Sequence, residues 1–185
     1  MRFFITKKSK MPFDIVVGVH ADNWAIGAEG KIPWKCPADM KFFKELTTTT
    51  RDPAKTNAVI MGRATFVSMG KPLPNRLNIV LSKMPFLVNQ REGVFFMQDF
   101  NEAVQQLEEM PDIETIYVIG GEMVYRQAIS HPKCDKIYLN TIHKTCDLSK
   151  ADRFFPAINK YDFELIKKAP IDLCVTAYLY KKYMM

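Results

Sequence analysis

The sequence predicts an α/β domain, with a mostly parallel central sheet of about eight strands and an antiparallel edge strand, in three layers with about four flanking helices. Three observations predict this fold. Short runs rich in Val, Ile and Tyr alternate with segments of helical periodicity, as when a helix connects two parallel strands. Two of these runs end in glycine directly before a helical segment. The last two runs have no helical segment between them, so we expect them to pair antiparallel at one sheet edge.

The expected elements follow one another along most of the chain. Strands are expected at residues 14–21, 57–62, 77–82, 94–97, 116–120, 136–142, 163–168 and 175–182. Helices are expected at residues 38–46, 64–69, 102–109 and 122–129, the third with Asn101 as its N-cap. Residues 26–37 are rich in Gly and Pro, and we expect them to form a flexible loop beyond the carboxyl end of the first strand. An open α/β sheet places its ligand there, and a mobile lid could exclude water from it.

The composition is that of an ordinary globular protein. The 185 residues, 48% hydrophobic and 25% charged, suit one domain, and we expect residues 1–12 to be a tail and residues 13–185 that domain. No apolar run approaches the roughly 20 residues of a membrane span, and no secretory signal is visible, so we expect a cytoplasmic protein without a membrane partner. The four cysteines lack the paired spacing of a zinc site, so we expect no metal and reduced thiols.

The formal net charge of +6 bears on the kind of partner. A basic protein suits nucleic acid, but it suits a small polyanion such as a dinucleotide phosphate or a polyglutamate equally well. The basic residues are scattered, without a dense run beyond Lys7-Lys8 and without interleaved aromatic residues. This distribution argues against nucleic acid and favours a small-molecule ligand.

Two charged residues are candidates for ligand contacts. Asp39 lies in a first helical turn, where the positive end of the helix dipole is the ordinary explanation for an acidic side chain. Phe42, Phe43 and Leu46 follow it on the same helical face, however, so Asp39 shares the apolar side of its helix. A carboxylate there is costly unless it is paired, and a cationic or amidine-like ligand could be its partner. Arg76 is either an exposed turn residue or a two-pronged partner for a carboxylate.

Two strand-glycine-helix connections are candidates for a phosphate site. Gly62-Arg63 and Gly120-Gly121 each lie at the start of an expected helix, whose first N–H groups can bind an anion. Each is also explained as an ordinary tight connection, and neither matches a nucleotide-binding fingerprint. Lys83 follows the third strand, where a site for a free ribose hydroxyl often carries an acid. A Lys after a strand is usually just a solvated loop residue, but together with Arg63 this cation favours NADPH over NADH.

In their order along the chain, these segments resemble the dihydrofolate reductase family. The resemblance runs from about residue 14 to residue 180 and is more specific than any single motif. Its motifs are Ile26-Gly27, Pro33-Trp34, Pro37-Ala38-Asp39-Met40 with Phe42-Phe43, Val59-Ile60-Met61-Gly62-Arg63 with Thr65, Pro72-Leu73-Pro74 with Arg76, Leu81-Ser82, and Val118-Ile119-Gly120-Gly121 with Tyr125. It implies the fold of that family and NADPH-dependent reduction of 7,8-dihydrofolate to 5,6,7,8-tetrahydrofolate in one-carbon and thymidylate metabolism, with antifolates as inhibitors.

The resemblance also implies a substrate site. Asp39 would bind the 2-amino group and N3 of the pterin, and Arg76 the α-carboxylate of the glutamate tail. Asp39, Trp34 and Asn140 would form the catalytic group, with Asp39 acting through water because its ring contacts lie away from N5. The residues implied to contact the substrate are Val17, Gly18, Val19, Ile32, Asp39, Met40, Phe42, Phe43, Lys44, Met69, Leu73, Arg76, Ile119 and Tyr125.

NADPH is the implied cofactor, and the hydride passes from nicotinamide C4 to pterin C6. Ile32 and Trp34 would belong to the lid. The residues implied to contact the cofactor are Val19, Ala25, Ile26, Gly27, Ala28, Glu29, Gly30, Lys31, Gly62, Arg63, Ala64, Thr65, Leu81, Ser82, Lys83, Met84, Ile119, Gly120, Gly121, Glu122, Met123, Val124, Tyr125, Arg126 and Gln127.

One position departs from the family pattern. Where the family usually has Thr beside the catalytic acid, this chain has Asn140, whose amide can also donate to a carboxylate. The departure motivates one alternative, a catalytically silent dinucleotide-binding protein. A second alternative is a riboflavin-pathway NADPH reductase of similar fold, against which Arg76 and the helix beginning Pro37-Ala38-Asp39 argue. The sequence leaves open a fusion with thymidylate synthase as partner.

Overall fold

The structure, a computed structural model, describes residues 11–83 and 93–183, which form ten strands and four helices. The strands are β1 (Phe13–His20), β2 (Ala25–Ala28), β3 (Thr56–Gly62), β4 (Arg76–Leu81), β5 (Val94–Met97), β6 (Ile113–Val118), β7 (Cys134–Ile142), β8 (Ala151–Phe154), β9 (Phe163–Asp172) and β10 (Val175–Lys182). The helices are α1 (Pro37–Thr48), α2 (Arg63–Met69), α3 (Phe100–Glu109) and α4 (Glu122–Ile129).

Eight strands form one sheet in the order β5-β4-β3-β6-β1-β7-β10-β9. The first six of these pair in parallel, so their carboxyl ends meet at one edge of the sheet. β10 runs antiparallel to β7 on one side and to β9 on the other. β2 and β8 form a separate two-stranded sheet.

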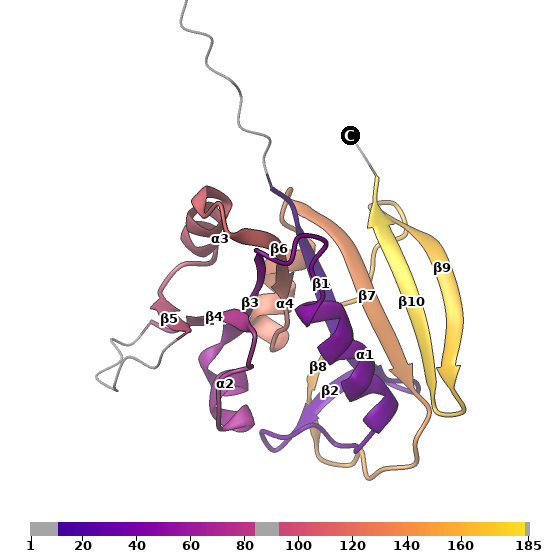
Figure 1. Ribbon diagram of the computed structural model, residues 1–185. Coiled ribbons are helices and arrows are strands. Elements are labelled where there is room, and N and C mark those ends of the chain that lie inside the picture. The colour runs from indigo at the N-terminus through magenta and orange to yellow at the C-terminus, as the bar shows by residue number, and fades with distance from the viewer. Residues whose placement is uncertain (1–10, 84–92, 184–185) are drawn as a thin grey trace, which may run out of the picture.

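Helices cover both faces of the main sheet (Figure 1). Because successive strand residues point to opposite faces, most buried side chains of the described residues divide between two clusters, one on each face of the sheet. Val59 and Met61 of β3 pack with α1 and α2, whereas Ala58 and Ile60 of the same strand pack with α3 and α4. No helix in the described part of the chain is long and apolar enough to cross a membrane.

The predicted sheet, its four helices and the antiparallel pairing of the last two strands are confirmed, with ends that differ by a few residues. The antiparallel strand β10 lies one place in from the edge, which β9 occupies. The prediction of Asn101 as the N-cap of the third helix is wrong. Asp99 caps α3, since its Oδ1 accepts a hydrogen bond of 2.9 Å from the N–H of Glu102, and the helix begins at Phe100.

The prediction of an irregular loop at residues 26–37 is wrong at its start. Ala25–Ala28 forms β2, which pairs antiparallel with Ala151–Phe154, or β8. Both strands have only four residues and neither is rich in β-branched residues, so composition and periodicity gave no strand signal. In Figure 1 this small sheet lies at the end of the molecule where β7 finishes, beside the amino end of α1. It therefore borders the carboxyl edge of the main sheet.

Asp14 is a buried carboxylate inside the main sheet. It pairs with Lys136 across β1 and β7, and its side chain is 8% exposed. Lys136 Nζ lies 3.8 Å from Asp14 Oδ2, and the Lys136 N–H donates to Oδ1 at 3.2 Å. Burial outweighs the attraction of Lys136 and raises the pKa of Asp14 to about 6.

We expect Asp14→Asn to stabilise the protein at neutral pH but not in acid. The folded state holds the Asp14 proton to a higher pH than the unfolded state, whose ordinary pKa is 3.8, so stability falls as pH rises from about 4 to about 6. Above that window the ionised carboxylate costs on the order of 3 kcal/mol. Urea unfolding of both proteins from about pH 4 to pH 8 measures the effect. A stability difference that stays constant with pH would contradict the burial account.

Candidate functional site

The two strand-glycine-helix connections lie side by side at the carboxyl edge of the sheet. β3 and β6 are neighbours, and the N–H of Gly62 donates to the carbonyl of Gly120 at 2.7 Å. α2 and α4 therefore begin next to each other, and a Cβ on Gly121 would lie 3.1 Å from Thr65 Oγ1. The peptide between Gly120 and Gly121 is cis. The connections at Gly62 and at Gly120-Gly121, which lie far apart in the sequence, thus form one surface of turn backbone.

Tyr125 explains why glycine is required at position 120. Gly120 has a φ of +97°, and a Cβ there would lie 2.5 Å from the ring of Tyr125. Tyr125 is 5% exposed, and its hydroxyl donates to the carbonyl of Val16 in β1 at 2.9 Å. Burial and the nearby charge of Asp39 raise the pKa of Tyr125, which keeps the hydroxyl protonated. The turn is therefore a fixed, bare stretch of backbone, which fits the close approach of a phosphate group.

The other residues predicted for the cofactor differ in their exposure. Ser82 follows β4, and its N–H donates to the carbonyl of Met97 at 2.8 Å. Exposed side chains are those of Glu29, Lys31, Arg63, Ala64, Lys83, Met123, Arg126 and Gln127. Partly or fully buried residues are Val19, Ala25, Ile26, Gly27, Ala28, Thr65, Leu81, Ile119, Glu122 and Val124. Met84 lies outside the described residues.

Asp39 stands in the first turn of α1 with its carboxylate against the sheet. The residue is half-buried. A Cβ on Gly18 of β1 would lie 2.9 Å from Oδ2 of Asp39, so glycine is needed where the carboxylate approaches the strand. Phe43 and Leu46 pack against the buried cluster under α1 and α2. Asp39 therefore shares the apolar side of its helix, as the sequence predicts.

Asn140 is the hydrogen-bond partner of Asp39. It lies in β7 in register with Gly18, and its Nδ2 donates to Oδ1 of Asp39 at 2.8 Å. Burial raises the pKa of Asp39, and this hydrogen bond opposes the rise because it stabilises the charged form. Asn140 is 2% exposed, and its Oδ1 has no hydrogen-bond partner among the described residues. The departure from Thr therefore keeps a donor for the acid but leaves a buried acceptor unsatisfied, which costs about 1–3 kcal/mol.

Arg76 lies at the opposite end of α1. It is the first residue of β4 and only 6% exposed, which excludes the alternative of an exposed turn residue. Nη1 of Arg76 donates to Thr47 Oγ1 at 2.8 Å, and Nε donates to the carbonyl of Pro74 at 3.0 Å. The guanidinium carbon lies 5.8 Å from the ring centre of Phe43. Burial lowers the pKa of Arg76, but a guanidinium stays charged, and no ion pair within residues 11–83 and 93–183 involves it.

Asp39 and Arg76 are the two ends of an apolar wall along α1. Thr47, the partner of Arg76, follows Asp39 by eight residues, or about 12 Å of helix. Half-buried side chains between these ends pack against one cluster, and they are Phe43, Leu46, Met69 and Leu73. A molecule with an amidine-like ring at one end and a carboxylate at the other would meet both charged groups.

The remaining residues predicted for the substrate divide between the two faces of the sheet. The side chains of Val17 and Val19 lie in the cluster under α3 and α4, so a ligand beside Asp39 would meet only their backbone. Ile119 lies in the cluster under α1 and α2. Along α1, Phe42 is half-buried, whereas Met40 and Lys44 are exposed.

Trp34 is anchored while its neighbour in the predicted lid is not. Trp34 is 9% exposed and packs with Cys36, Ile142 and Val175. Ile32, two residues earlier, is 59% exposed. One end of the segment is therefore fixed to the sheet, and its middle faces outward.

Two contacts of the site were missed by sequence reasoning. Thr47 has the pattern of an ordinary polar residue at a helix end, yet it is fully buried and its hydroxyl oxygen accepts a hydrogen bond from Arg76. Val16 contributes only its carbonyl, which any residue could supply to Tyr125. The alternation along β1 could have placed Val16 and Gly18 on the face of Asp39, but no sequence signal points to Thr47.

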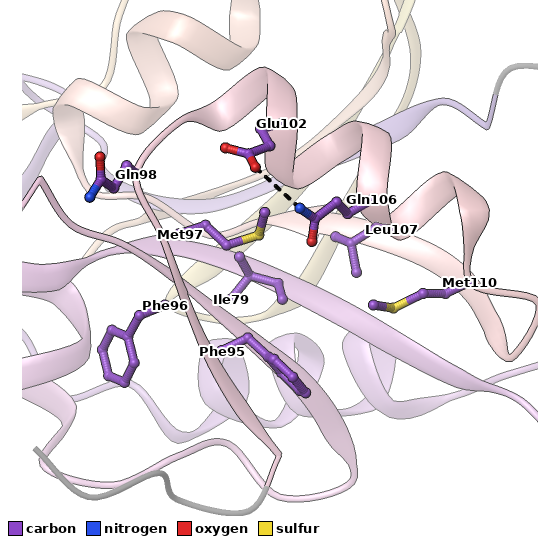
Figure 2. Close-up of a pocket in the computed structure, with 9 residues that line it drawn as sticks. All are labelled: Ile79, Phe95, Phe96, Met97, Gln98, Glu102, Gln106, Leu107 and Met110. Atoms are coloured by element: carbon purple, nitrogen blue, oxygen red, sulfur yellow. Dashed lines mark hydrogen bonds between the residues drawn. The ribbon is translucent and has the colours of Figure 1, made fainter. Parts of the chain in front are cut away.

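A pocket of about 350 Å³ lies away from these residues, between β5 and α3 (Figure 2). Its lining residues are Ile79, Phe95, Phe96, Met97, Gln98, Glu102, Gln106, Leu107 and Met110. Figure 2 shows Gln106 hydrogen-bonded to Glu102 along the α3 side, at 3.2 Å. None of the residues predicted for substrate or cofactor lines it, so the chemistry argued above does not depend on this pocket. Within the described residues, no group of three or more His, Cys, Asp or Glu side chains could hold a metal.

Joined glycine turns at the carboxyl edge of a parallel sheet, next to a half-buried carboxylate in the first turn of α1, are typical of α/β enzymes that bind a nucleotide beside a second ligand. The family model for dihydrofolate reductase matches residues 14–178. Dihydrofolate reductase of Heliothis virescens is 39% identical over 161 residues, or 84% of this chain and 85% of that protein. That of Drosophila melanogaster is 38% identical over 149 residues, or 79% of this chain and 80% of that protein. The chain belongs to the dihydrofolate reductase family.

A bifunctional dihydrofolate reductase-thymidylate synthase from Daucus carota is also similar. It is 39% identical over 156 residues, which make up 80% of this chain but only 29% of the carrot protein. The similarity to that relative is therefore confined to less than a third of its length.

We expect Asn140→Leu to raise the pKa of Asp39 further, because the variant removes the amide donor that stabilises the charged carboxylate. Asn140→Thr keeps a hydroxyl donor and removes the unsatisfied amide oxygen, so its Asp39 pKa should stay near that of the wild type. A carboxyl carbon NMR titration of each protein measures the effect. An unchanged pKa in Asn140→Leu would show that the hydrogen bond does not control the ionisation.

Proposed function

We propose that this chain reduces 7,8-dihydrofolate to 5,6,7,8-tetrahydrofolate with NADPH, and that residues 13–185 form the single catalytic domain. Members of the family are reductases that use a nicotinamide cofactor. The observation that carries the proposal is the carboxylate of Asp39, which is held by a neutral amide and paired with no cation among the described residues. A buried carboxylate without a cationic partner favours a ligand that brings two N–H donors to it.

Asp39 would orient the pterin. Its carboxylate would accept hydrogen bonds from the 2-amino group and N3, while the Asn140 amide holds Oδ1 in place. Because Asn140 is fixed in β7 and the carboxylate of Asp39 lies against Gly18 of the neighbouring strand β1, the ring would be positioned without further ordering of the protein, and such positioning is a large part of catalysis. Because its pKa is raised, Asp39 takes up and releases its proton at a pH closer to neutral. Asp39 can therefore supply a proton to N5 through water. Trp34 would complete the catalytic group by covering the ring, which limits access of solvent.

Arg76 would bind the other end of the substrate. Thr47 and Pro74 each accept one of its N–H groups, which leaves Nη2 and the second N–H of Nη1 for a carboxylate. The wall formed by Phe43, Met69 and Leu73 would contact the aromatic portion between the two charged ends. This arrangement favours a folate over the pyrimidine substrate of a riboflavin-pathway reductase, which has no glutamate tail.

The surface at Gly62 and Gly120-Gly121 would hold the phosphates of NADPH. Bare backbone and the neighbouring starts of α2 and α4 offer N–H donors, and the exposed cations Arg63 and Lys83 favour the additional phosphate that distinguishes NADPH from NADH. When bound, NADPH supplies the hydride that reduces C6. The chain's own contribution is to place the phosphates and to exclude water above the ring.

We expect dihydrofolate-dependent loss of NADPH absorbance with the wild-type protein. Asp39→Asn should lower turnover by about 10²-fold or more, because an amide cannot carry the proton or the charge, while NADPH affinity stays within about twofold. Steady-state assays and fluorescence titration with NADPH measure the two effects. Absence of turnover in the wild type, with NADPH still bound, would instead support the silent dinucleotide-binding alternative. Equal loss of turnover and NADPH binding in Asp39→Asn would make Asp39 structural.

A further inference from the structure

Glu122 accepts three hydrogen bonds, two from Arg126 one turn later in its own helix and one, which its position in the sequence does not predict, from β8. It is the first residue of α4, directly after the Gly120-Gly121 turn. Its Oε1 accepts from Nε and Nη2 of Arg126 at 3.1 and 2.8 Å. Its Oε2 accepts from the backbone N–H of Phe154, the last residue of β8, at 3.2 Å. The carboxylate thus joins the start of α4 to the small β2–β8 sheet.

An acidic side chain at this place needs an explanation. A carboxylate at a helix start is favourable for the helix alone, but here it lies beside the surface proposed to receive phosphates, which it would repel. Arg126 compensates the charge of Glu122, and the Phe154 N–H donates a hydrogen bond to its second carboxylate oxygen. Both contacts keep the pKa of Glu122 low, the Arg126 hydrogen bond most strongly. The charge is therefore held in place and turned toward β8 and Arg126.

The contact with Phe154 reaches the predicted lid through backbone pairing. Phe154 pairs with Ala25 of β2, the residue directly before the predicted lid segment 26–37. The next residue, Phe155, is buried, its ring centre lies 5.0 Å from that of Tyr125 in α4, and its N–H donates to the carbonyl of Trp24 at 3.0 Å. Two successive residues of the chain, Phe154 and Phe155, thus bind two residues on one face of α4, Glu122 and Tyr125.

We propose that Glu122 is a positioning residue that ties β8, and through it strand β2 at the start of the predicted lid, to the helix start of the cofactor site, so that cofactor binding and lid closure are coupled. The proposal rests on the proposed function for its effect on the reaction. Its structural part, the hydrogen bond to Phe154, is independent of that function. Glu122 touches neither substrate nor reacting atoms in this account and acts through β8.

Two variants separate the hydrogen bond from the charge, and a third is the control. Glu122→Ala removes both. Glu122→Gln keeps an oxygen that can accept from the Phe154 N–H but has no charge. Glu102→Ala is the matched control, because Glu102 is also a first-turn glutamate with a partner four residues on, Gln106, and it contacts no lid strand.

The first measurement is amide hydrogen exchange in the protein without cofactor. We expect exchange at Phe154 and in β2 to be about tenfold or more faster in Glu122→Ala, and within about threefold of wild type in Glu122→Gln and Glu102→Ala. Equal acceleration in Glu122→Gln and Glu122→Ala would overturn the hydrogen bond as the cause. Wild-type exchange in Glu122→Ala would overturn the tie altogether.

The second measurement is single-turnover hydride transfer with saturating NADPH and dihydrofolate. We expect Glu122→Ala to slow it about tenfold, with the KM for dihydrofolate within about twofold and with Glu102→Ala at the wild-type rate. Faster exchange with unchanged hydride transfer would overturn the coupling. If the wild type itself shows no turnover, the proposed function fails, and the exchange measurement still decides whether Glu122 holds β8.

Discussion

The parallel pairing of β1 with β6 on one side and β7 on the other is the constraint on which the candidate site depends. Because these strands run in the same direction, the Gly120-Gly121 turn and the last residues of β1 and β7 meet at one edge of the sheet. The β1–β7 register places Asn140 beside Gly18, and the missing side chain at Gly18 admits the carboxylate of Asp39. A shift of β7 by one residue would turn Asn140 to the other face and remove the donor.

Among the described residues, the buried Asp14 and the half-buried Asp39 both place a carboxylate at β1, and the two differ in the charge of their partners. Asp14 lies beside the ammonium of Lys136, so its charge has a partner within the protein. Asp39 receives only a neutral amide, although burial raises its pKa as well. An ion pair with a cation of the protein would compensate the charge of Asp39, and the carboxylate would then no longer favour a ligand with N–H donors. The same reasoning applies to Arg76, whose partners are a hydroxyl and a carbonyl and whose charge remains uncompensated within the described residues.

Sequence reasoning predicted the main sheet because its strands are strongly apolar and its helices fall between them. Asp39 could be placed on the apolar face because helical spacing relates it to Phe42, Phe43 and Leu46. β2 and β8 could not be predicted, since four-residue strands stabilised by pairing across more than 100 residues leave little local pattern. The contacts from Thr47 to Arg76 and from Glu122 to Phe154 were missed for the same reason, because each depends on the tertiary fold. Asn140 was identified at the position where the family usually has Thr, with an amide able to donate to the acid, and its Nδ2 donates to Asp39 Oδ1 at 2.8 Å.

The central claim is that Asp39 meets the ligand ring as an uncompensated carboxylate. The most direct test is the ionisation of a 2,4-diaminopyrimidine antifolate bound to the protein, followed by ultraviolet difference spectroscopy above the pKa of the free inhibitor. A carboxylate partner stabilises the protonated ring, so the wild type should bind the inhibitor as a cation and Asp39→Asn should bind it neutral. The same inhibitor spectrum in both complexes would contradict the account.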